Sequence, residues 1–351
     1  MTMTDHTPDP PAVADPDGSR QPLGLDAAGH RINPGLRLYR LTETSICIGL
    51  GARGLWIDGV SAADRAYLAR LAASEAHVDY DVGDPGLPSR QRCHQLDDLV
   101  ASVLVTTEPY RLHGIQADIL APDLADWSLA YAAHSGPTLQ RRADAVVRVH
   151  GLGRAGAHAA QLLVSAGVGT LVLADGADVH PRDLGTGPLT LPDLGRHRTA
   201  AVARRLAAAH PQANLLTSAG EAAVDITLLF ADPATGLPLQ DSAEPGGALL
   251  PVRFEDGRAV VGPLVLPGLT PCLRCTIDHP LASPSSTPAG TELTLAATAA
   301  GLAAMHALMV VDQVNVPASA GHEIAVDLAS GATTLTAQRT GPHCGCAGPR
   351  T

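Results

Sequence analysis

The sequence is organised around residues 145–178, which read AVVRVHGLGRAGAHAAQLLVSAGVGTLVLADGAD. The Val-rich run over 146–150 predicts a buried strand, and the apolar run over 170–174 predicts a second one. Between them, the Ala/Leu-rich stretch 154–165 predicts a helix that ends at the glycines of AGVG. The stretch is therefore expected to form a βαβ unit.

The turn that joins the first strand to the helix has the pattern G-x-G-x-x-G, formed by Gly151, Gly153 and Gly156. Its glycines serve a tight turn, the close approach of backbone to a phosphate, and close packing of helix on strand. The helix N-terminus offers free N–H groups to an anion. Asp175 ends the second strand, where a ribose hydroxyl would lie. This combination predicts a nucleotide-type fold.

Composition excludes several classes of protein. All 24 basic residues among the 351 are Arg. Without Lys there is no Walker-type P-loop, Schiff-base enzyme, pyridoxal-phosphate enzyme or protein kinase. The net charge of −11 argues against a general nucleic-acid binder. No apolar run is long enough to suggest a membrane span, and the acidic, Pro-rich start lacks signal-peptide features, so a cytoplasmic protein is expected.

Changes in composition and periodicity along the chain suggest four parts. Residues 1–30 are expected to be a disordered tail. Residues 31–105 combine short strands with two helices, which suggests a small winged-helix-like α+β domain. Residues 106–140 are expected to be a connector, with a break at Pro122 and a helix over 123–133. Residues 141–351 continue the nucleotide-type α/β fold.

Individual elements are expected as follows. In the front domain, strands are predicted over 36–41, 45–50 and 54–60, and helices over 64–73 and 90–104. After the βαβ unit, helices are predicted over 196–209 and 292–311, and strands over 224–230, 248–254, 259–266, 323–328 and 332–337.

Four of the six cysteines form two short pairs, Cys272-x-x-Cys275 and Cys344-x-Cys346. Two such pairs complete a tetrahedral thiolate site, so structural zinc is expected, with His343 as a possible substitute ligand. Redox thiols or unpaired cysteines are the alternatives, and a reducing cytosol disfavours a disulfide. Cys47 lies in an apolar strand and is expected in the core, while Cys93 is a weak candidate nucleophile.

The ordered set of strand, glycine turn, helix ending AGVG, D-x-x-D, C-x-x-C, long helix and C-terminal Cys pair resembles the ThiF/MoeB/HesA superfamily, the relatives of ubiquitin-activating enzymes. The resemblance covers about residues 140–348, and AGVGTLVLADGADV is its most specific piece. It implies a Rossmann-type mixed sheet with a structural zinc site. It also implies ATP·Mg binding, adenylation of the C-terminal carboxylate of a peptide or small protein, and a homodimer.

The resemblance assigns positions. The three turn glycines would line the nucleotide phosphates, Asp175 would bind the ribose with Asp178 beside it, and Asp232 would bind Mg²⁺. Arg198 falls where the family has its catalytic lysine.

The departures from the family pattern bear on activity. Arg154 replaces a glycine of the phosphate loop, where it would either bind a phosphate or fill its place, and Asp183 stands where the family has Asn. Thr186 stands where the family has Arg, and Pro233 follows the Mg²⁺ aspartate. Losing one preorganised cation at a phosphoryl-transfer site typically costs roughly 10²–10³ in rate. Arg is also not interchangeable with a lysine point charge.

Three hypotheses remain. In the first, a degenerate scaffold presents a peptide to a separate YcaO-type enzyme; this arrangement resembles the leader-peptide-binding partner proteins of azole and azoline peptide biosynthesis. There, the front domain takes the peptide as an added strand, for which residues 45–50 or 54–60 are suited. In the second, the chain is an active adenylyltransferase. In the third, it is an NAD(P)-dependent oxidoreductase, although no acid/base residue for hydride transfer is evident.

Overall fold

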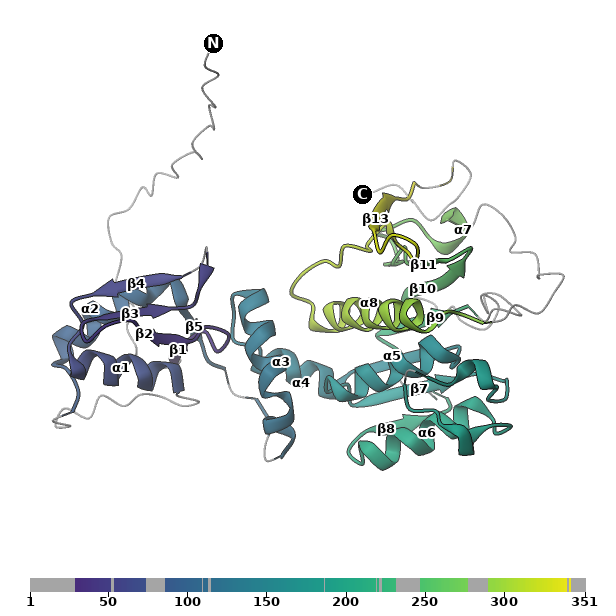
Figure 1. Ribbon diagram of the computed structural model, residues 1–351, viewed down its shortest axis with the longest axis horizontal. Helices are drawn as coiled ribbons and strands as arrows, with labels where there is room; N and C mark the ends of the chain where they lie inside the picture. Colours follow the sequence, from purple (N-terminus) through teal and green to yellow (C-terminus); the bar gives the residue numbers. More distant parts are fainter. Residues whose placement is uncertain are drawn as a thin grey trace, which may run out of the picture.

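The structure is a computed structural model that describes residues 29–51, 54–73, 86–108, 110–112, 115–185, 187–218, 220, 223–231, 247–276, 290–339 and 341. A small α+β region precedes two helices, α3 and α4, and these lead into a larger α/β region (Figure 1). The predicted tail lies almost wholly outside the described residues.

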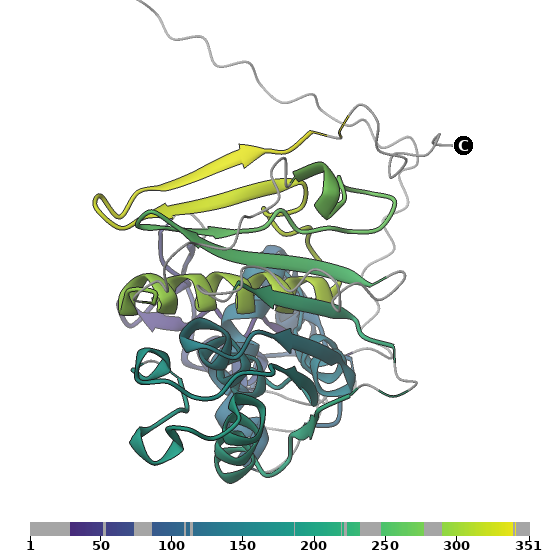
Figure 2. The ribbon, with the colours of Figure 1, turned by 90° about the vertical axis from the view of Figure 1, so that its right-hand side faces the viewer.

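An eight-stranded mixed sheet is the centre of the α/β region, as the sequence predicts. Its strand order is β13-β12-β11-β10-β9-β6-β7-β8, and the strands stack in this order from top to bottom in Figure 2. From β10 to β8 all neighbours are parallel, whereas β10 to β13 pair antiparallel. The strands are β6 (Val146–His150), β7 (Thr170–Ala174), β8 (Asn214–Leu216), β9 (Ile226–Phe230), β10 (Ala248–Glu255), β11 (Arg258–Val261), β12 (His322–Asp327) and β13 (Thr333–Ala337).

Helices α5 (Arg154–Ser165) and α8 (Leu293–Asp312) pack side by side against this sheet, and α6 (Arg198–Ala209) lies against β7 and β8. Small residues let α5 and α8 approach closely: Ala159, Ala160, Ala299, Ala300 and Ala303 are all completely buried. By length and composition alone α8 could cross a membrane, but more than half of its most apolar part is buried inside the protein.

The front region has a separate core. Strands β2 (Leu38–Arg40), β3 (Ser45–Ile48) and β4 (Leu55–Asp58) form an antiparallel sheet in the order β2-β3-β4. Helices α1 (Ala62–Ala73) and α2 (Arg90–Val100) contribute Leu68 and Leu96 to the same core as Ile46 and Ile48. The predicted second helix stops early, because residues 101–103 form the short 3-10 helix η2 and β5 (Leu104–Thr106) then pairs with β1 (His30–Ile32).

The expected break at Pro122 is wrong. One helix, α3 (Ile115–Tyr131), runs through this proline, and a second helix, α4 (Gly136–Asp144), follows. A proline inside a helix removes one backbone hydrogen bond, but tertiary contacts can outweigh that loss. Here the buried Leu120 and Ser128 hold the helix on both sides of Pro122.

A buried ion pair ties α3 and α4 to α8. Arg142 and Asp312 are both completely buried and form two hydrogen bonds of 2.8 and 2.6 Å. The Tyr131 hydroxyl donates to the same carboxylate at 2.7 Å, and the Trp127 ring lies 4.8 Å from the guanidinium carbon. The front region is joined to α3 in turn, since the Asn33 amide donates to the Ser128 carbonyl at 2.7 Å.

Candidate functional site

The glycine turn between β6 and α5 has the geometry that its sequence pattern predicts. Gly151 has φ = +87°, and a Cβ there would lie 2.3 Å from the Phe230 carbonyl oxygen. A Cβ on Gly156 would lie 1.8 Å from the Gly151 carbonyl oxygen, so helix and turn touch through their backbones. At Gly153 the nearest neighbour of a Cβ is Asp183, at 3.6 Å. A Cβ on the middle glycine would thus make only ordinary van der Waals contacts, whereas the other two glycines serve close packing.

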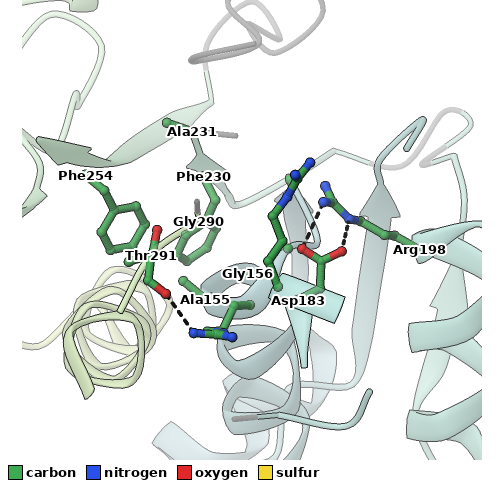
Figure 3. Close-up of a pocket in the computed structure, with 13 residues that line it drawn as sticks. Ala155, Gly156, Asp183, Arg198, Phe230, Ala231, Phe254, Gly290 and Thr291 are labelled. Carbon is green, nitrogen blue, oxygen red and sulfur yellow. Dashed lines mark hydrogen bonds and ion pairs between the residues drawn. The ribbon is translucent and has the colours of Figure 1, made fainter. Parts of the chain in front are cut away.

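A small cavity of about 40 Å³ lies in front of the N-terminus of α5 (Figure 3). The carboxyl ends of β9 and β10 and the start of α8 form its other walls. Its lining combines glycines, two phenylalanines and three arginines: Gly151, Gly153, Arg154, Ala155, Gly156, Arg182, Asp183, Arg198, Phe230, Ala231, Phe254, Gly290 and Thr291.

Arg198 is held by carboxylates at the back of this cavity. Its side chain is only 2% exposed. Its Nε and one terminal nitrogen each donate to Asp183 at 2.9 Å, a two-pronged pair drawn in Figure 3. The other terminal nitrogen lies 3.3 Å from Asp175. The charge of Arg198 is thus balanced inside the protein.

Asp175 joins the glycine turn to the end of β7 through hydrogen bonds. One oxygen accepts the Leu152 N–H at 2.6 Å and the other accepts the Ala177 N–H at 2.8 Å. Its carbonyl also accepts the Thr199 hydroxyl at 2.8 Å. Both carboxylate oxygens therefore have partners within the chain, and its binding of a ribose stays a prediction.

Arg154 and Arg182 are the other cations of the cavity. Arg154 begins α5 and donates to the Thr291 carbonyl at 2.7 Å, which joins the phosphate-type loop to the start of α8. The buried Nε of Arg182 has no hydrogen-bond partner within the described part of the chain. Next to Thr291, Glu292 caps α8, and hydrogen bonds from Thr294 and Leu295 lower its pKa to about 2. The negative charge of Glu292 therefore lies next to the rim of the cavity.

The remaining predicted ligands lie elsewhere. Asp178 is half exposed, and its carboxylate pairs with the His197 ring at 2.9 Å rather than lining the cavity. Asp232, the predicted Mg²⁺ ligand, lies outside the described residues.

The predicted zinc centre is only half described. The Sγ atoms of Cys272 and Cys275 lie 3.8 Å apart. Two thiolates that bind one tetrahedral Zn²⁺ at about 2.3 Å are separated by about 3.8 Å, so the pair fits one ion. Cys344, Cys346 and His343 lie outside the described residues, and the described ones contain no group of three or more potential ligands. Structural zinc stays a prediction.

The other two described cysteines, Cys47 and Cys93, are both buried. Burial raises the pKa of the Cys93 thiol, which disfavours the role of a nucleophile.

Phe230 and Phe254 are site residues that the sequence interpretation missed. They are the only two phenylalanines of the chain, and both line the cavity. Phe230 ends β9 and Phe254 stands near the end of the neighbouring parallel strand β10. Two features of the sequence could have identified them as site residues. Phenylalanine is rare in this chain, and both residues stand at strand ends, where α/β sheets bind ligands.

In the front region, the structure separates the two candidate strands for peptide pairing. β3 is the central strand of its sheet, bonded on both sides, so residues 45–50 offer no free edge. β4 is a terminal strand, and its outer edge pairs with no other described strand. Trp56, in the middle of β4, is 68% exposed. Only residues 54–60 thus keep the predicted capacity for strand addition.

Comparison with known proteins agrees with this architecture. Residues 128–230 match the ThiF family. The structure of E. coli MccB with ATP superposes with a TM-score of 0.66 at 16% identity, covering 91% of this chain and 99% of that one. The structure of the microcin C7 biosynthetic enzyme MccB in complex with N-formylated MccA gives 0.65 at 15% identity, with the same coverage. PaaA gives 0.64 at 15% identity, covering 87% and 99%. At these identities the likeness shows the fold, and it includes the front region. No curated protein sequence matches the chain.

Proposed function

We propose that the protein is a peptide-binding scaffold of ThiF type, in which the front region captures a peptide and the former nucleotide cradle no longer adenylates it. The observation that carries the proposal is the internal neutralisation of Arg198 by Asp183 and Asp175. Stabilising a charged phosphoryl group needs preorganised cations that face it. Arg198 would have to leave a buried, bidentate pair to do so, and breaking such a pair is expensive.

The peptide half of the proposal rests on the front region. Its three-stranded sheet ends in β4, whose outer edge has no strand partner among the described residues, and an extended peptide would gain main-chain hydrogen bonds there. Support also comes from the whole-chain likeness to MccB, which has been solved in complex with MccA. A YcaO-type enzyme would then act on the presented peptide.

Active adenylation is the second candidate, favoured by one specific observation. The backbone of the glycine turn is intact, since Gly153 leaves room in front of the α5 N-terminus. In addition, the similar MccB has been solved with ATP. The charges of the cavity do not fit this role, because Arg198 is already paired with Asp183 and Asp175. The ThiF match over residues 128–230 disfavours the oxidoreductase alternative.

The charge argument makes a testable prediction about ATP binding. Wild-type protein is expected to show no heat of binding when titrated with millimolar ATP·Mg. Asp183→Asn removes one of the two carboxylate charges that neutralise Arg198 and the one that binds it bidentately, so the affinity for ATP should rise by at least about tenfold and become measurable. Asp178→Asn is the matched control, because Asp178 pairs with His197 outside the cavity, and it should behave like wild type. Tight wild-type binding would favour the adenylating enzyme instead.

A further inference from the structure

The short segment that leads into α8 forms one wall of the cavity at the glycine turn. We call residues 290–293 the strap. Gly290 and Thr291 line the cavity, Glu292 is the N-cap of α8, and Leu293 is the first residue of this helix. Behind the strap the helix is fixed, because Leu295 is buried in the main core. The strap therefore joins a fixed helix to the rim of the cavity.

A hydrogen bond from the phosphate-type loop holds the strap in place. One terminal nitrogen of Arg154, the first residue of α5, donates to the Thr291 carbonyl at 2.7 Å (Figure 3). The two residues are 137 positions apart, so this bond joins two separate walls of the cavity. Its donor is charged and it is partly shielded from water. Losing such a bond shifts an equilibrium by roughly tenfold or more.

Packing holds both ends of the strap. At its start, a Cβ on Gly290 would lie 3.1 Å from the Arg182 Cβ, so the backbone of Gly290 rests on the stem of Arg182. At its end, Leu293 Cδ1 lies 2.5 Å from the position of a Cβ on Gly185. Gly290 has φ = +111° and Gly185 has φ = +129°, which residues with side chains rarely adopt. The strap is thus closely fitted, and a glycine stands where it begins.

With the strap in this position, the cavity is too small for a nucleotide. Its volume of about 40 Å³ has room for a few water molecules at most. Pockets that hold cofactors typically enclose roughly 300–1,000 Å³. A ligand of nucleotide size could therefore enter only after the strap had moved away from α5.

Resting on the proposed function, we infer that Arg154 is a latch that holds the strap closed, so that the protein blocks its own nucleotide cradle by closure as well as by charge. The two barriers are independent. Asp183 and Asp175 neutralise the cation Arg198, whereas Arg154 fixes a wall. The glycine of the family pattern has no side chain that could make this contact. The same substitution thus alters the phosphate loop and supplies the latch.

Hydrogen exchange followed by mass spectrometry, on the full-length protein without nucleotide, tests the latch directly. Arg154→Ala removes the donor and keeps a good helix former at the start of α5. Peptides that contain the strap are expected to exchange at least about tenfold faster than in wild type. Peptides from β9 should exchange as in wild type, which shows that the fold is intact. Arg154→Met keeps the aliphatic stem and should accelerate the strap equally.

Arg90→Ala is the matched control for this experiment. Arg90 also begins a helix, α2, and it is exposed in the front region, so its loss should leave exchange of the strap unchanged. If the strap exchanges at the wild-type rate in both Arg154→Ala and Arg154→Met, the latch is refuted, whatever the function of the protein.

Titration with ATP·Mg separates the latch from the proposed function. Added to Asp183→Asn, Arg154→Ala should raise the affinity for ATP by about a further tenfold, because the closed strap no longer competes with the ligand. A lower affinity in the double variant would mean that Arg154 binds a phosphate, which would overturn the latch. Tight binding of ATP to wild type would refute the scaffold instead. The latch would survive that result if Arg154→Ala still released the strap and bound ATP more tightly than wild type.

Discussion

Replacing Asp312 with Ala is expected to lower the free energy of unfolding by about 3–5 kcal/mol, because it removes both hydrogen-bonded oxygens from the buried guanidinium of Arg142 and leaves it only the one-third-exposed Asp123, 4.0 Å away. Both side chains are completely buried, and they hold α4 against α8. Burial and the hydrogen bond to Asp312 raise the pKa of Tyr131, so Tyr131 is a neutral donor that cannot replace the lost carboxylate. Urea unfolding followed by circular dichroism measures the loss.

Two further variants separate this effect from a general loss of charge. Glu43→Ala removes the acid of an ion pair whose side chains are 57% and 80% exposed, and it should change the free energy by at most about 0.5 kcal/mol. The double variant Arg142→Met/Asp312→Leu replaces the pair with apolar groups and should recover much of the stability lost in Asp312→Ala. A loss below about 1 kcal/mol for Asp312→Ala would show that Arg142 reaches water or another acid.

Gly156→Ala is expected to have an effect of similar size, at least about 3 kcal/mol, for a steric reason. The added methyl group would lie 1.8 Å from the Gly151 carbonyl oxygen, so the turn and the helix must move apart. Gly176→Ala is the control, because a Cβ there meets nothing within 4 Å. It should stay within about 0.5 kcal/mol of wild type. Thermal unfolding without nucleotide measures both, and a stable Gly156→Ala would contradict the close packing described for this turn.

The sequence predicted the mixed sheet because its signals are local. The strand, turn and helix of residues 145–178 each follow from periodicity and from glycine placement. The part of α3 before Pro122 was missed because this proline dominates any local interpretation, whereas the contacts of Leu120 and Ser128 are tertiary. The pairing of β1 with β5 joins residues more than 70 positions apart, so no local pattern reveals it.

The site could be predicted only in part. Sequence placed Arg198 and Asp183 in the cradle and identified both as departures from the family pattern. It could not show that the two departures form one ion pair, because the residues are 15 positions apart and meet only through the fold. Arg154 was expected either to bind a phosphate or to fill its place. In the structure its side chain instead donates a hydrogen bond to the Thr291 carbonyl, 137 residues away in the sequence.

The role of the front region depends on a distinction that only the structure makes. Residues 45–50 and 54–60 read alike as short apolar strands, and either could have been an edge. The sheet order β2-β3-β4 leaves the outer edge of the second strand without a strand partner among the described residues. Leu55, the first residue of that strand, lines one pocket with Leu129 of α3.

The most direct test of the central claim is ATP–pyrophosphate exchange with the purified full-length protein, Mg²⁺, and peptides that bind to it in a phage-displayed library of random sequences. Adenylation transfers AMP to a carboxylate and releases pyrophosphate, so an adenylating enzyme returns labelled pyrophosphate into ATP. The neutralised Arg198 predicts peptide binding without exchange above the protein-free background. Peptide-dependent exchange would contradict the scaffold and show that the cradle still activates a carboxylate.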